Sequence, residues 1–78
     1  ATPERILQRD RLKDVVFAAI AELPEELRIA VSLRELDGMS YDEIAEVMDC
    51  PIGTVRSRIF RAREAIEKKM QPYLEASA

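Results

Sequence analysis

Histidine is absent from this chain of 78 residues, and cysteine occurs once, at Cys50. Zinc is held mainly by these two residue types, so we expect neither a metal site nor a cofactor. Enzymes that activate a nucleophile usually pair it with a base such as histidine, and the carboxylates here are scattered, so we expect no enzyme. A lone cysteine cannot form an internal disulfide, which favours a reducing, cytoplasmic environment.

Glycine is scarce, at two residues, and no stretch alternates β-branched or aromatic residues with polar ones. Both features argue against a β-sheet. No apolar run approaches the roughly 18 residues of a membrane-spanning helix. Charge is abundant, at 35% of residues, as in short amphipathic helices with solvated outer faces. The length suits one small domain.

The spacing of apolar residues, together with residues that begin and end helices, predicts four helices. The first begins with Thr2 as N-cap and Pro3 at the first helical position. It carries an apolar stripe over residues 12–23. The second begins after Pro24 and ends at Gly38, a C-terminal cap. Its inner face is expected to contain Leu27, Ala30, Val31 and Leu36.

The third and fourth helices follow with few residues between them. Ser40 and Glu43 have the spacing of a capping box, which predicts a short third helix over residues 41–48. The fourth begins at residue 51 or 52, and Pro72 is expected to end it or to kink its last turn. The chain is then divided into an interdomain linker or start of the first helix (residues 1–9), one domain (residues 10–72) and a C-terminal tail (residues 73–78).

A short helix, a tight turn and a longer basic helix make up a helix-turn-helix arrangement. Asp49 lies in the turn where glycine is commonest, and aspartate tolerates the left-handed conformation better than most residues. Ile44, Met48 and Val55 fall where the two helices must pack together. The predicted fold class is therefore all-α, a four-helix domain containing a helix-turn-helix.

The fourth helix has two different faces. At about 100° per residue, one apolar stripe points inward. It consists of Val55, Ile59, Ala62 and Ile66. The outward side, near the helix start, carries Arg56, Ser57, Phe60 and Arg61 beside Gly53 and Thr54. In a recognition helix this half enters the major groove, where arginine can pair with guanine and an aromatic ring can contact a thymine methyl.

Positive charge is concentrated on this helix, although the whole chain has a net charge of −3. Residues 53–69 hold six basic side chains and two acidic ones, a net of +4, which leaves −7 for the other positions. Attraction to nucleic acid depends on the local charge, so a basic face on an acidic domain is compatible with DNA binding. The acidic remainder offers a surface to a basic protein partner.

Each of these features also has a purely structural interpretation. The arginines could form an ordinary solvated face, and Phe60 could cap the core or contact another protein. Cys50 could be a small buried residue of the turn. Ser40 could touch phosphate or serve only to cap its helix. Arg34 could pair with Asp37 on the surface or contact the DNA backbone.

Two segments, LRELDGMSYDEIA and CPIGTVRSRIFRAR, carry a resemblance to a known family. From about Leu12 to Pro72, the sequence resembles region 4, the C-terminal domain, of extracytoplasmic-function sigma factors of the sigma-E type. The resemblance implies a four-helix domain that binds a GGAAC-type −35 promoter element within the RNA polymerase holoenzyme. It also implies two protein partners, the flap tip of the polymerase β subunit and an inner-membrane anti-sigma factor, and no small-molecule substrate.

The resemblance also implies roles for individual residues. Besides Gly53, which lets the backbone approach DNA, the candidate DNA-contacting residues are Thr54, Arg56, Ser57, Phe60, Arg61 and Arg63. Candidates for contact with the DNA backbone are Arg34, Ser40 and Tyr41. A complete sigma factor of this family also needs a domain that melts the promoter, so we expect this piece alone to bind DNA weakly.

Two other classes of protein are alternatives. The DNA-binding domain of a response regulator has a similar four-helix arrangement, but its last helix normally shows an exposed apolar stripe for dimerisation. Here that helix stays charged through Lys69. A helical module that binds only protein would direct the arginines to an acidic partner, and its DNA affinity would not depend on Arg56.

Overall fold

The computed structural model describes the backbone of residues 3–77 and the side chains of residues 9–75. This part of the chain is helical with short connections and contains no strand, so the predicted all-α fold is confirmed. Thr2, the expected N-cap of the first helix, lies outside the described residues. The four helices are α1 (Pro3–Ala21), α2 (Glu25–Glu35), α3 (Tyr41–Met48) and α4 (Ile52–Ser77).

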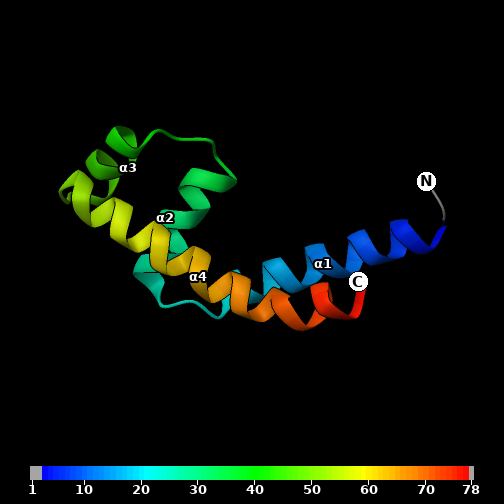
Figure 1. The fold of residues 1–78 in the computed structure, drawn as a ribbon. Helices are drawn as coiled ribbons and strands as arrows, with labels where there is room; N and C mark the ends of the chain where they lie inside the picture. The colour runs from blue at the N-terminus through cyan, green and yellow to red at the C-terminus, as the bar shows by residue number, and fades with distance from the viewer. Residues whose placement is uncertain (1–2, 78) are drawn as a thin grey trace.

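Helices α1 and α4 run antiparallel along the length of the molecule, which measures 44 × 21 × 18 Å. The N-terminal end of α1 and the C-terminal end of α4 lie at the same end (Figure 1). Helices α2 and α3 pack against the first half of α4 at the opposite end. The first turns of α4 are thereby held far from both described ends of the chain.

The buried side chains form two clusters, and α4 contributes to both. One cluster joins α1, α2 and α4 through Ile20, Leu23, Val31 and Ala62. The other joins α2, α3 and α4 through Ala30, Ile44, Val55 and Ile59. The predicted inward stripe of α4 is confirmed, since its first three members are at most 1% exposed and Ile66 is half-buried. Burial of this one stripe in two successive clusters fixes how α4 is oriented.

The expectation that Leu36 faces the core is wrong, because its side chain is 56% exposed. At about 100° per residue, Leu36 lies about 180° around the helix from Leu27. It also falls at the C-cap, after the regular helix has ended at Glu35. The other expected inner residues of α2 are buried or half-buried.

The connection between α2 and α3 depends on two local features. Gly38, expected to end α2, follows the last helical residue by three positions and turns the chain with a left-handed φ of 69°. The capping box is confirmed: the backbone N–H of Glu43 donates to Ser40 Oγ (3.1 Å), and that of Ser40 donates to Glu43 Oε1 (3.0 Å). These bonds satisfy amide groups that would otherwise lack a partner at the start of α3.

Helix α4 continues through Pro72 to Ser77, so of the two alternatives for Pro72 the one in which it ends the helix is wrong, and the one in which it kinks the last turn stays a prediction. Proline lacks the N–H that would bond the carbonyl of Lys68, which is one turn earlier. Both residues are exposed, so water can bond to that carbonyl and reduce the cost. The division into linker, domain and tail stays a prediction.

Candidate nucleic-acid interface

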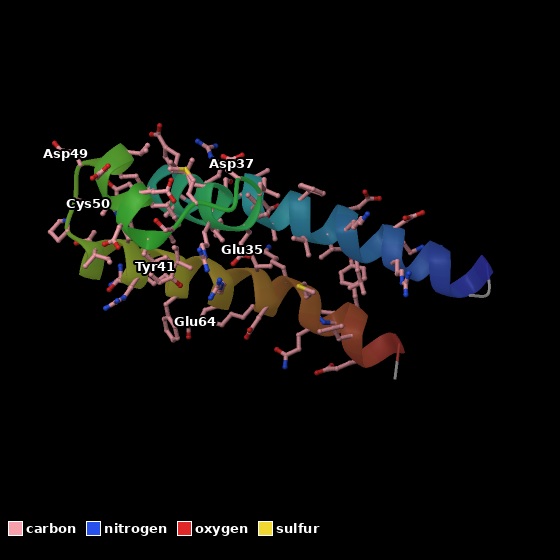
Figure 2. All side chains as sticks on the ribbon, turned by 90° about the horizontal axis from the view of Figure 1, so that it is seen from above. Glu35, Asp37, Tyr41, Asp49, Cys50 and Glu64 are labelled. Carbon is pink, nitrogen blue, oxygen red and sulfur yellow. The ribbon has the colours of Figure 1, made fainter. Side chains whose placement is uncertain are left out.

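The turn between α3 and α4 has the predicted conformation. Asp49 is the C-cap of α3 with a left-handed φ of 52°, and its N–H bonds to the carbonyls of Ala45 and Glu46. The N–H of Cys50 donates to the Ala45 carbonyl at 3.1 Å. Ile44 before the turn and Val55 after it are both 0% exposed, which locks the two helices together. Asp49 and Cys50 lie at the end of the molecule where α4 begins (Figure 2).

Four predicted groove residues are exposed together on the outward side of α4. Arg56, Ser57, Phe60 and Arg61 span an arc of about 140° around the helix, opposite the buried stripe. Neither the Arg56 nor the Arg61 side chain makes a hydrogen bond or ion pair with any side chain or backbone group among the described residues. Their guanidinium donors are therefore available to an external acceptor.

The ring of Phe60 is 64% exposed, which excludes its interpretation as a cap on the core. Such exposure leaves a large apolar area in water unless another molecule covers it. Gly53 and Thr54 lie nearly two turns before Phe60. They line an open, mostly polar cleft of about 380 Å³ with Ser57, Arg58, Arg61, Glu26 and Leu27. Apart from its chain neighbours and the backbone of its own helix, no heavy atom lies within 4 Å of where a Cβ on Gly53 would be, so close approach by a partner is sterically possible.

Arg63, another predicted DNA contact, is held by a residue of α2. Its Nε donates to Glu35 Oε1 at 3.0 Å, and its Nη2 contacts the same oxygen. This hydrogen bond raises the pKa of Arg63 above its ordinary value, and the nearby charge of Glu35 and the Tyr41 hydroxyl contribute in the same direction. Unlike Arg56 and Arg61, Arg63 has an acceptor within the domain.

The three residues predicted to contact the DNA backbone also have internal partners. Arg34 Nη1 donates to the Met39 carbonyl at 2.8 Å, and its guanidinium lies over the Tyr41 ring, 5.1 Å from the centroid. Arg34 is thus used at the start of α3 and does not pair with Asp37. Ser40 is the N-cap of α3. DNA contacts by these residues stay predictions.

Arg58 has a structural role that sequence reasoning did not assign. Its Nη1 lies 3.6 Å from Cys50 Sγ and 3.9 Å from Met48 Sδ, and its Nη2 lies 3.7 Å from Glu26 Oε2. Its side chain is only 21% exposed. The sequence feature that indicates this role is the position of Arg58 next to Ile59, at the edge of the inward stripe, where an arginine stem can cover apolar surface.

A second surface of the domain is apolar. A groove of about 330 Å³ runs between α1, α2 and α4, and we call it the α1/α4 groove. Phe17 and Leu36, which stand at its edges, are 54% and 56% exposed. The groove is lined by Val16, Phe17, Ile20, Val31, Leu36, Ile66 and Met70, with Glu35, Arg63 and Glu67 as its polar members.

No group of three or more cysteine, aspartate or glutamate side chains is arranged to hold a metal ion in the described part of the chain. None of the helices described here is both long and apolar enough to cross a membrane.

Helix α4 is basic, and the outward arginines Arg56 and Arg61 have no partner among the described residues. A left-handed turn joins α4 to the short helix α3. Together these features define a helix-turn-helix domain of the DNA-binding class. Comparison with known proteins specifies the family. The family model described as Sigma-70, region 4 matches residues 13–66. The chain belongs to this family, and as a region 4 domain it is part of a transcription factor rather than an enzyme.

Curated relatives are similar over almost the whole chain. The ECF RNA polymerase sigma-E factor of Escherichia coli K12 is 60% identical over 74 residues, which cover 95% of this chain and 39% of that protein. The protein of the same name from Haemophilus influenzae is 59% identical over 73 residues, or 94% of this chain and 39% of that protein. The chain therefore spans about 39% of the length of these relatives.

Proposed function

We propose that the chain is the −35 recognition domain of an extracytoplasmic-function sigma factor and that α4 reads promoter DNA in the major groove. The observation that carries this proposal is the exposed, unpartnered set on one side of α4, formed by Arg56, Ser57, Phe60 and Arg61. The start of α4 adds unpaired backbone N–H groups and the positive end of the helix dipole, both of which attract phosphate.

The DNA contact that we propose for each residue follows from its position along α4. Arg56 and Arg61 each present a planar fork of donors that matches the acceptor pair on the major-groove edge of guanine. Ser57 and Thr54 would bond bases or phosphates, and Phe60 would cover a thymine methyl or sugar edge. A GGAAC-type element provides adjacent guanines for the arginines.

We test this function by fluorescence anisotropy, with one duplex that carries a GGAAC-type element and a second duplex of the same composition in scrambled order. The wild-type chain should bind the first duplex more tightly. Arg61→Ala should weaken binding to that duplex by about 1–3 kcal/mol and reduce the preference between the two.

Lys68→Ala is the matched control, because it also removes one exposed positive charge from α4. It should weaken binding to both duplexes equally, as expected of sequence-independent attraction. Equal affinity of the wild-type chain for both duplexes would contradict base reading. A protein-only module would show no dependence of DNA affinity on Arg61.

We also propose that this domain works inside RNA polymerase holoenzyme in the bacterial cytoplasm. The α1/α4 groove has the apolar lining that an amphipathic helix requires, and we assign it to the flap tip of the polymerase β subunit. An anti-sigma factor anchored in the inner membrane would hold the protein inactive by covering the same groove. These partners are supported by the family and by the exposed apolar edges of the groove, Phe17 and Leu36.

A further inference from the structure

Arg63 lies close to Arg56 around α4 but farther from the helix start, and it is about 160° around the helix from Arg61. It follows Arg56 by seven residues, so the two side chains are about 20° apart around the helix and about 10 Å apart along it. In a helix that enters the groove with its N-terminal half, a side chain that is farther along the axis than Arg56 and on the opposite side of the helix from Arg61 reaches the sugar–phosphate backbone rather than base edges. The DNA group within reach of Arg63 is therefore a phosphate.

Glu35 already occupies the edge of the guanidinium that a phosphate would use. Both Nε and Nη2 of Arg63 point at Glu35 Oε1, and these are the two donors that form a bidentate pair with a carboxylate or a phosphate. Glu35 comes from the last turn of α2, 28 residues away in sequence, and lies beside α4 near Tyr41 (Figure 2). A phosphate can bind Arg63 in this way only after Glu35 has left.

The pair is open to exchange with an external anion. The side chains of Arg63 and Glu35 are 50% and 46% exposed, so water and ions reach both partners. Exposed ion pairs of this kind contribute little to folding, so loss of the pair does not endanger the domain. The Glu35 carboxylate would in addition repel the phosphate that approaches Arg63.

We propose that Glu35 limits the affinity of the domain for the DNA backbone by competing with phosphate for Arg63. The inference rests on the proposed DNA-binding function and adds a residue that restrains it. Arg56 and Arg61 keep their donors free for the DNA, whereas Glu35 neutralises Arg63, so sequence-independent attraction is lower than the number of arginines suggests. Glu35 therefore affects DNA binding only indirectly, through its ion pair with Arg63.

The test is to measure the affinity of Glu35→Gln for the GGAAC-type and scrambled duplexes at several salt concentrations. Release of Arg63 should strengthen binding to both duplexes by about two- to fivefold, the range that corresponds to an exposed ion pair. One additional phosphate contact should also make the plot of log affinity against log salt steeper by about 0.9. A purely structural role for Glu35 would not change that slope.

Two comparisons separate the competition from a simple change of net charge. In an Arg63→Ala background, Glu35→Gln should no longer strengthen binding or change the slope. Glu64→Gln removes the same charge from an exposed residue next to Arg63 that points away from the other helices (Figure 2), and its effect should persist in the Arg63→Ala background. Melting curves for each variant confirm that the fold is retained.

The outcomes are distinct. An unchanged affinity and slope for Glu35→Gln, or a gain that survives Arg63→Ala, would overturn the competition even if the wild-type chain prefers the GGAAC-type duplex. If the wild-type chain binds neither duplex, the proposed function fails. In that case, binding of a duplex by Glu35→Gln would still support the release of Arg63. Failure of Glu35→Gln to bind either duplex would overturn the proposed competition.

Discussion

Arg58 of α4 reaches back across the turn to Cys50, with 3.6 Å between Arg58 Nη1 and Cys50 Sγ. The same guanidinium contacts Met48 at the end of α3 and approaches Glu26 at the start of α2. One half-buried arginine therefore joins three helices and the turn that sets their angle. Cys50, half-buried beneath it, packs against the α2–α3–α4 cluster.

We expect Arg58→Ala to destabilise the fold by about 0.5–1.5 kcal/mol, because it removes weak bonds and the packing of the arginine stem. Urea unfolding measures this directly. Since the guanidinium of Arg58 faces the turn, the preference for the GGAAC-type duplex over the scrambled one should remain. Loss of that preference without loss of stability would mean that Arg58 reads DNA instead.

Substitutions of neighbouring residues on the two faces of α4 should affect different properties, stability on the inward face and DNA binding on the outward face. Val55→Ala creates a cavity at a site that is 0% exposed and should cost about 2–3 kcal/mol of unfolding free energy. Arg56→Ala should leave the melting temperature nearly unchanged and weaken specific DNA binding by about 1–3 kcal/mol. Calorimetry and anisotropy on both variants check the pair. Equal losses of stability would contradict the assignment of faces.

The capping box of α3 should make stability depend on acid pH. Hydrogen bonds from the backbone and side chain of Ser40 lower the pKa of Glu43 below its ordinary value of 4.5. A carboxylate with a lowered folded pKa stabilises the fold fully above the unfolded value and loses that contribution as pH falls through the folded value. We therefore expect wild type to exceed Glu43→Gln in stability above pH 4.5 and to lose this advantage below it.

Glu46→Gln is the control for the capping box. It removes the same charge from an exposed residue of α3 that lies outside the box. Urea unfolding across the acid range compares the three proteins. A pH profile of Glu43→Gln that parallels the wild type at every pH would show that the box contributes nothing through its charge.

The α1/α4 groove should bind a helical peptide with the sequence of a β flap tip. Phe17→Ser removes an apolar side chain from the edge of the groove and should weaken peptide binding at least about tenfold, as for an aromatic anchor. Its effect on stability should be small because Phe17 is 54% exposed. Ile29→Ser, which changes an exposed apolar residue of α2 that does not line the groove, should leave peptide binding unchanged. Equal losses for the two variants would remove the groove from the interface.

Features that depend on local chain geometry were predictable from the sequence. The capping box, the left-handed turn at Asp49 and the inward stripe of α4 follow from rules that act within one or two helical turns. The exposure of Phe60 follows from the same periodicity. These features suffice to define the helix-turn-helix and its outward face.

Features that depend on contacts between distant segments were not predictable. No local pattern pairs Arg63 with Glu35, because the contact requires α2 and α4 to be docked first. The same holds for Arg58, whose partners lie on two other helices and the turn. Pro72 is a different case, because here a local rule gave the wrong prediction. A proline usually ends a helix, yet α4 continues through it.

The most direct test of base reading by α4 is an NMR titration of the nitrogen-labelled chain at low salt. The GGAAC-type and scrambled duplexes are added in separate experiments. We predict large amide shifts confined to residues 53–63 with the GGAAC-type duplex and small, dispersed shifts with the scrambled one. Equal small shifts with both duplexes would contradict base reading and leave only attraction to phosphate.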